Sequence, residues 1–164
     1  EAYAPVFVEV RGRREAAPSA GFGAEYAGQL RLSALMRAES ATEGFGCAED
    51  VDGFVFKATG QEPFWHVRVL HDRITLSTLE IPSTTFAESP PIPMNGGWRF
   101  ESESTGPETV QLRLELRRGP CTDSMVGSVY TWEAVLDVGG DVSRGCAWEG
   151  ALAPGRRAMN PITG

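Results

Sequence analysis

The residue types that could support proton transfer lie in two short stretches of the chain. Glu62 and His66 belong to the stretch 60–69, and Asp123 belongs to the stretch 121–125. A glutamate and an aspartate can act as general acid and general base when both carboxyl groups reach one substrate. Nothing in the spacing sets the distance between these side chains, so hydrogen bonds in turns and caps are the simpler interpretation. We predict no catalytic residue, and Glu62, His66 and Asp123 remain candidate binding residues.

The cysteines allow a second kind of chemistry. The chain holds three, Cys47, Cys121 and Cys146, so one disulfide would leave one thiol over. A bond between Cys121 and Cys146 would close a loop of about 26 residues and stabilise the fold by roughly 3 kcal/mol. Free buried thiols are the alternative, whereas a metal site has little support because no C-x-x-C or H-x-x-x-H pair occurs. Cys47 is either a small buried hydrophobe or an exposed thiol that links two copies. We predict no metal and no cofactor, and a monomer or a Cys47-linked dimer.

Aromatic side chains are the third candidate group. Trp65, Trp98 and Trp132 could line the mouth of a β-barrel and hold an apolar molecule. Tryptophans on alternating strands are more often part of the core. The stretch 82–97 holds four prolines, and we expect it to be a largely irregular loop that could recognise a partner.

The elements that must position these residues are expected to be short strands. Apolar and polar residues alternate with period two over 110–117 and 130–138, which is typical of strands with one buried face. Gly119-Pro120 is expected to end the first of them. Gly 19 and Pro 11 in 164 residues indicate many turns, and no alternation of strands with helices is visible. We predict an all-β fold, a small antiparallel barrel or sandwich, because closure removes exposed sheet edges.

The same patterns predict the organisation of the chain. Val6, Val8 and Val10 alternate within a separate β-rich region, residues 1–50. Residues 51–152 are expected to form the barrel domain. Residues 153–164 have little to bury and are expected to be a flexible tail.

The charge of the chain limits the classes of partner. A net charge of −7 disfavours nucleic acid and anionic membrane surfaces, because both require a clustered basic face. No run of about 20 apolar residues occurs, so we predict no transmembrane segment. A basic protein is the partner that this charge would attract.

Three motifs resemble those of a known family. GQEPFW at 60–65, CTDSM at 121–125 and GC at 145–146, with Tyr130 between them, are similar to the G-x-E-P-F-W, C-x-D-x-M and G-C motifs of a family of uncharacterised bacterial cell-envelope proteins, which are predicted periplasmic lipoproteins. The resemblance covers residues 53–150. It implies export to the periplasm or outer membrane, with lipid anchoring through a segment outside this sequence as one possibility. It also implies a Cys121–Cys146 bridge, and a small barrel loosely like those of lysozyme-inhibitor and META-type lipoproteins.

These observations lead to one expectation about function and two alternatives. We expect a non-enzymatic envelope protein that binds another protein or an envelope component. The most specific partner that we consider is a basic lysozyme-like hydrolase. Binding to it would make the protein a lysozyme inhibitor. The second alternative is a barrel that binds a small apolar ligand through its tryptophans.

Overall fold

The computed structural model describes residues 6–40, 53–81, 83–125, 127–150 and 152–154, and every regular element in these ranges is a β-strand. The strands are β1 (Val6–Glu15), β2 (Gln29–Ser40), β3 (Phe56–Gln61), β4 (Phe64–Val69), β5 (Ile74–Thr78), β6 (Thr84–Phe86), β7 (Ile92–Met94), β8 (Gly97–Glu103), β9 (Gln111–Thr122), β10 (Val129–Val138) and β11 (Asp141–Glu149). All of their pairings are antiparallel. The prediction of an all-β fold is confirmed.

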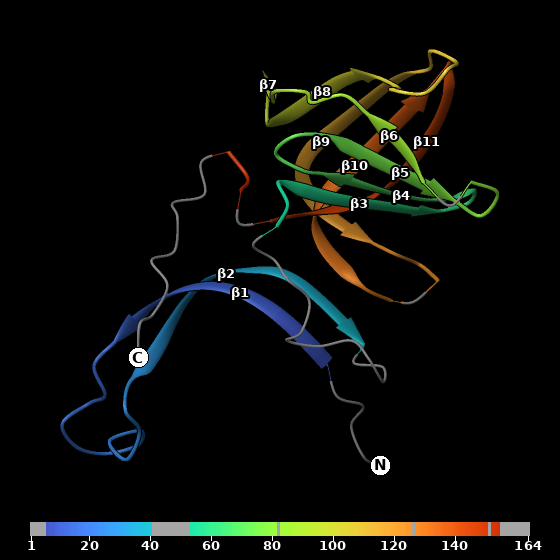
Figure 1. The fold of residues 1–164 in the computed structure, drawn as a ribbon. Coiled ribbons are helices and arrows are strands. Elements are labelled where there is room, and N and C mark those ends of the chain that lie inside the picture. The colour runs from blue at the N-terminus through green and yellow to red at the C-terminus, as the bar shows by residue number, and fades with distance from the viewer. Residues whose placement is uncertain (1–5, 41–52, 82, 126, 151, 155–164) are drawn as a thin grey trace.

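The main sheet curls until its two ends meet. Its strand order is β6-β5-β4-β3-β11-β10-β9-β8-β7, and β1 and β2 form a hairpin beside it. Phe86 at the end of β6 forms a β-bridge with Ser104, which follows β8. Next to this bridge, the Ala87 amide donates to the Glu103 carbonyl at 3.0 Å. These contacts join the two ends, so the curled sheet in the upper right of Figure 1 is a small barrel.

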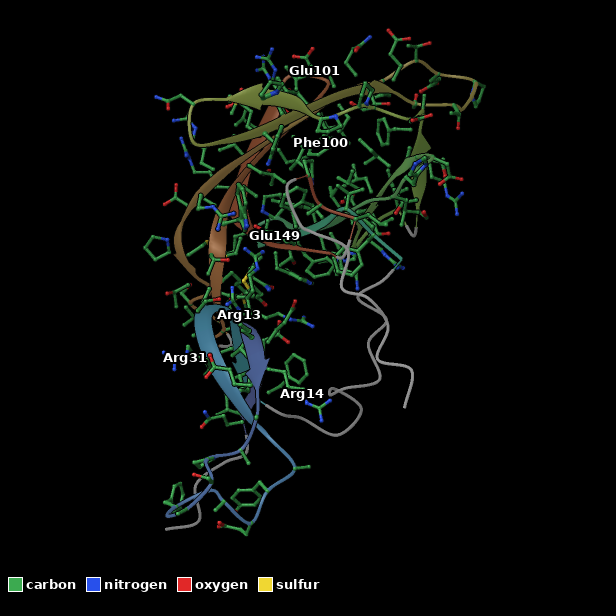
Figure 2. The ribbon with its side chains drawn as sticks, turned by 90° about the vertical axis from the view of Figure 1, so that its left-hand side faces the viewer. Arg13, Arg14, Arg31, Phe100, Glu101 and Glu149 are labelled. Carbon is green, nitrogen blue, oxygen red and sulfur yellow. A yellow bond between two sulfur atoms is a disulfide. The ribbon has the colours of Figure 1, made fainter. Side chains whose placement is uncertain are left out.

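Apolar side chains at alternate strand positions fill the barrel. Figure 2 shows Phe100 of β8 pointing inward and Glu101 pointing outward, as the pleat of a strand requires. The larger inward-facing side chains are Phe56, Trp65, Val67, Ile74, Phe86, Leu112, Leu114, Leu116, Trp132 and Leu136. Burying each of them stabilises the fold by about 1.5–3 kcal/mol.

Two of the motif glycines allow close packing, Gly60 against Trp65 and Gly145 between β11 and β3. Gly60 of β3 is the register partner of Trp65, and a Cβ added at Gly60 would overlap the indole Nε1. Gly145 of β11 lies next to Gly60, so that a Cβ at Gly145 would be 2.9 Å from the Gly60 Cα. The absence of a side chain at Gly60 provides the space that the indole occupies, and its absence at Gly145 lets β3 and β11 approach each other closely.

The prediction that Gly119-Pro120 ends a strand was wrong, whereas the stretch 82–97 is irregular over most of its length, as predicted. β9 continues through Gly119-Pro120, because these residues lie at a register shift in the β9–β10 ladder. Proline is tolerated at such a bulge, where its missing N–H breaks no ladder hydrogen bond. The proline-rich stretch 82–97 contains the two three-residue strands β6 and β7 and the first residue of β8. Both short strands lie where the sheet ends meet, and proline is compatible with an edge strand.

A buried charge cluster attaches the N-terminal hairpin to the barrel. β2 pairs with β10 over only two residue pairs. The side chain of Arg37 is 1% exposed, and its guanidinium lies 3.2 Å from Glu9 and 3.4 Å from Glu39. The guanidinium also lies over the rings of Phe7 and Trp148, at 4.9 and 5.2 Å from their centroids. Arg37 therefore joins β1 and β2 to the outer face of β11.

Tyr130 of β10 belongs to the same cluster. Its hydroxyl donates to Glu39 at 2.9 Å, and its ring stacks on Trp148 with a centroid distance of 5.2 Å. Burial, followed by the charge of Glu39, raises the pKa of Tyr130 far above its ordinary value. The Tyr130 hydroxyl therefore stays protonated and remains a hydrogen-bond donor throughout the physiological pH range.

The boundaries of the predicted regions remain predictions. The hairpin and the barrel strands lie on either side of residues 41–52, which are outside the described ranges and include Cys47. The Cys47-linked dimer and most of the predicted tail at 153–164 therefore concern residues that the structure does not describe. The described residues contain no helical segment that could span a bilayer.

Cys121 and Cys146 form the disulfide that the resemblance implied. Their sulfur atoms are 2.02 Å apart and their Cα atoms 5.5 Å apart. The bridge packs on Phe54, Tyr130 and Trp148, in a small cluster on the outer face of the barrel. It therefore ties the end of β9 to β11.

Removing this bridge is expected to destabilise the protein measurably. The paired cysteines are 25 residues apart, so the double substitution Cys121→Ala with Cys146→Ala should lower the free energy of unfolding by about 3 kcal/mol through loop entropy. Urea titration followed by tryptophan fluorescence measures this loss. Wild-type protein treated with reductant should unfold at the same lowered midpoint. Equal midpoints for oxidised wild type and the double variant would contradict the role of the bridge.

Candidate functional site

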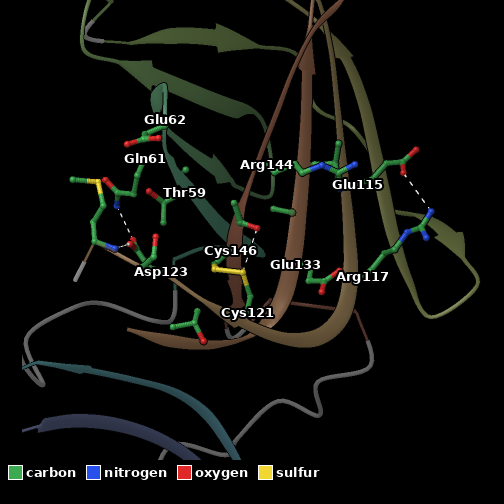
Figure 3. Close-up of a pocket in the computed structure, with 17 residues that line it drawn as sticks. Thr59, Gln61, Glu62, Glu115, Arg117, Cys121, Asp123, Glu133, Arg144 and Cys146 are labelled. Atoms are coloured by element: carbon green, nitrogen blue, oxygen red, sulfur yellow. Dashed lines mark hydrogen bonds and ion pairs between the residues drawn. A yellow bond between two sulfur atoms is a disulfide. The ribbon is translucent and has the colours of Figure 1, made fainter. Parts of the chain in front are cut away.

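A groove of about 710 Å³ lies on the outer surface of the barrel, around the disulfide. Figure 3 shows it between the turn after β3 on one side and the outward-facing side chains of β9, β10 and β11 on the other. The three sequence motifs supply most of its wall, through Gly60, Gln61, Glu62, Cys121, Thr122, Asp123, Ser124, Met125, Gly145 and Cys146. Three segments that are far apart in the sequence, between positions 60 and 146, thus meet at this groove.

Asp123 organises one wall of the groove. One carboxylate oxygen accepts a hydrogen bond from the Gln61 side-chain amide at 2.7 Å, and the other accepts from the Met125 backbone at 2.9 Å. The Asp123 backbone also closes the turn, through hydrogen bonds with Ser128 and Gly127. Asp123 is buried, so these bonds satisfy a carboxylate that would otherwise be costly to desolvate. The aspartate of the second motif therefore holds its own turn against the first motif.

The groove carries an excess of negative charge. Its acidic lining residues are Glu62, Glu115, Asp123 and Glu133, and its basic ones are Arg117 and Arg144. Arg117 and Glu115 are 3.8 Å apart and partly exposed, which is a weak ion pair. In the part of the chain that the structure describes, Glu62 and Glu133 have no cationic partner within 4 Å. Two carboxylates at the groove are thus available to a ligand.

The predicted site residues separate into two groups. Glu62 and Asp123 both line the groove, and so do neighbouring residues of the motifs to which they belong. Trp65 and Trp132 are buried in the barrel core, and half-buried Trp98 packs against that core. His66 is half-buried in β4 and is not part of the groove lining. The sequence analysis therefore identified one wall of the groove, whereas its tryptophans are mainly core residues.

A smaller hollow of about 380 Å³ contains Trp98 and the edge of Trp132. Its base is Glu149 of β11, a buried carboxylate that accepts hydrogen bonds from Arg11 at 2.7 Å, Arg118 at 2.7 Å and the Trp132 indole at 3.0 Å. These three donors satisfy Glu149. Because Arg11 belongs to β1 and Glu149 to β11, their contact is a second attachment point between the hairpin and the barrel. In Figure 2, Glu149 lies at the level where the barrel meets the hairpin.

Sequence reasoning missed the other wall of the groove. Glu115, Glu133 and Arg144 occupy outward positions of three strands, between the buried positions of the same strands. The alternation places each of them outside the barrel, but it does not say which outward positions become neighbours.

Comparison of the chain with protein-family models, with curated proteins and with solved structures gave no match.

Proposed function

We propose that this protein is a non-enzymatic binding protein of the bacterial cell envelope, in the periplasm or at the outer membrane, and that its groove binds a basic segment of a partner protein. The observation that carries the proposal is the meeting of all three motifs in one groove around the Cys121–Cys146 bridge. A disulfide is compatible with an oxidising, exported location. The motif resemblance supports the same compartment.

The charge and shape of the groove support a basic protein segment as the ligand. Glu62 and Glu133 face the groove with no cationic partner in the described residues, and the whole chain has a net charge of −7. Complementary charge steers partners together and selects between them. Met125, which is 65% exposed at the groove wall, offers an apolar contact beside the carboxylates. Such a surface suits an arginine or lysine side chain with a long apolar stem.

Of the two alternatives, the lysozyme inhibitor is a special case of this proposal, because it names a basic hydrolase as the partner. The apolar-ligand barrel has less support. The inward-facing side chains of the barrel pack as one buried cluster, and Trp65 and Trp132 belong to it. An apolar ligand would therefore have to displace core side chains.

The test compares three forms of the full chain as bait in a pull-down from a bacterial envelope fraction. They are the wild type, the groove variant Glu62→Gln with Glu133→Gln, and the control variant Glu88→Gln with Glu108→Gln. The control removes the same charge from exposed positions outside the groove lining. We expect wild type and control to recover a basic protein, and the groove variant to recover roughly tenfold less, as expected for a loss of about 1.4 kcal/mol.

Equal recovery by the two double variants would contradict the groove as the binding site. Recovery of no basic protein by the wild type would contradict the proposed partner class. The lysozyme alternative has a direct readout, which is the rate at which a basic c-type lysozyme degrades peptidoglycan in the presence of each form. Inhibition by wild type and control, but not by the groove variant, would support that alternative.

A further inference from the structure

The smaller hollow, which has Glu149 at its base, lies at the end of the barrel that faces the hairpin. Arg118 follows the core residue Leu116 by two positions in β9, and Glu149 follows the core residue Ala147 by two positions in β11. Because side chains two positions apart share one face of a strand, both lie on the inward face, beyond the last core residues. Arg11 of β1 reaches the same place from the hairpin. The smaller hollow is therefore bounded by the barrel end and by the hairpin.

Two arginines give this hollow a local positive charge in an acidic chain. The Glu149 carboxylate accepts hydrogen bonds from Arg11 and from Arg118, each at 2.7 Å, so two cations share one anion. Among the described residues, neither arginine has another ion-pair partner. Their side chains are 42% and 57% exposed, and each guanidinium has five N–H donors, so both keep donors that a ligand can reach. The groove at the motifs has the opposite balance, with four acidic and two basic lining residues.

The two guanidiniums are held in place before any ligand binds. Glu149, whose side chain is 5% exposed, fixes one end of each of them and also accepts from the Trp132 indole. The Arg118 guanidinium lies over the Trp132 ring, 4.6 Å from its centroid. Donors that are already ordered lose little conformational entropy when they bind a ligand, which favours affinity.

The remaining wall of the smaller hollow is apolar. It consists of Pro93, Met94, Trp98, Trp132 and Pro154. Half-buried Trp98 packs against the core with one part of its ring and leaves another part at the wall. Apolar and aromatic walls with a few fixed polar groups are typical of sites that bind small molecules, and about 380 Å³ is within the usual range of their volumes.

We propose that the smaller hollow binds a small organic anion with an aromatic or other apolar body. The anionic group, of which a carboxylate is the simplest, accepts charge-assisted hydrogen bonds from Arg11 and Arg118. The apolar body lies against Trp98 and Met94. A ligand in this position contacts the ends of core side chains without entering the barrel, so it displaces none of them. The smaller hollow shares no lining residue with the groove, and the inference does not depend on the function proposed for the groove.

The test is a fluorescence titration of the full chain with para-bromophenylacetate, because bromine quenches the emission of a neighbouring tryptophan. We expect saturable quenching with a dissociation constant in the low millimolar range, from about 0.3 kcal/mol for each non-hydrogen atom of the ligand. The neutral analogue para-bromophenylacetamide should bind roughly tenfold more weakly or worse, because it has no charge for the arginines to bind. Trp98→Phe should remove most of the quenching, because Trp98 is the more exposed of the two tryptophans on the wall.

Two arginine variants of β9 separate the smaller hollow from general positive charge. Arg118→Gln should weaken binding of the carboxylate roughly tenfold, as expected for the loss of one charged hydrogen bond. The matched control is Arg113→Gln, which removes a half-exposed arginine 2.9 Å from Asp137, outside the hollow, and should bind like wild type. Both variants should keep the wild-type circular dichroism.

Four results would each overturn the proposal. They are no saturable quenching of wild type by the carboxylate, equal affinity of wild type for carboxylate and amide, undiminished quenching in Trp98→Phe, and equal affinity of the two arginine variants. The comparison of carboxylate with amide uses only the wild type, so it does not depend on the folding of any variant.

Discussion

Substitution of Gly145 by alanine is expected to destabilise the protein by roughly 4 kcal/mol or more, which approaches the whole stability of a typical domain. The added Cβ would overlap the carbonyl oxygen of Thr59, a backbone atom of the neighbouring strand β3. A side chain could rotate away from such a contact, but a paired strand cannot move without breaking its ladder. The adjacent Cys146 is also tied to β9 by the disulfide, which limits movement of β11.

The matched control is Gly106→Ala. No heavy atom lies within 4 Å of a Cβ built at Gly106, and its φ is not in the positive range. This substitution should leave stability nearly unchanged or raise it slightly, because alanine restricts the unfolded chain. Urea unfolding midpoints of the two variants and of wild type decide the prediction. A Gly145→Ala protein as stable as Gly106→Ala would show that β3 and β11 do not approach each other as closely as described.

The second large effect is expected from Arg37→Met, which should cost about 3–5 kcal/mol. Methionine fills a similar volume but removes the charge between Glu9 and Glu39, which lie 3.2 and 3.4 Å from the guanidinium. The Glu39 carboxylate also accepts the Tyr130 hydroxyl, so the loss extends to the junction between hairpin and barrel. The measured quantity is the free energy of unfolding at pH 7.

Two further variants identify the cause of that loss. Arg31→Met removes a guanidinium that is 2.9 Å from Glu15 but 74% exposed, and it should cost less than about 1 kcal/mol. Arg37→Met combined with Glu9→Gln and Glu39→Gln also removes the two carboxylate charges beside the methionine and should recover part of the stability. No recovery in the triple variant would mean that packing against Phe7 and Trp148, and not charge, dominates the contribution of Arg37.

Much of the barrel could be predicted from alternation in the sequence. The runs 110–117 and 130–138 correspond to the bodies of β9 and β10, and their apolar positions are the buried ones. The prediction that Gly119-Pro120 ends the strand failed because a bulge lets the chain pass through both residues without losing its pairing. A local pattern cannot reveal a bulge whose partner lies on the next strand.

The candidate site was only partly visible in the sequence. Glu62 and Asp123 were identified and do line the groove, whereas Trp65 and Trp132, for which a barrel mouth was one alternative, lie in the core, the location that is more common for tryptophans on alternating strands.

By itself, the sequence determined the all-β class, the strands with one buried face and, through the motif resemblance, the cysteine pair. These follow from period-two alternation and from the spacing of residue types, which are local properties of the chain. Only the tertiary structure decided that three distant motifs share one groove and that Arg37 is buried between two glutamates. The physical reason is that barrel closure and the docking of the hairpin set which outward-facing residues become neighbours, and both depend on pairing between strands far apart in the sequence.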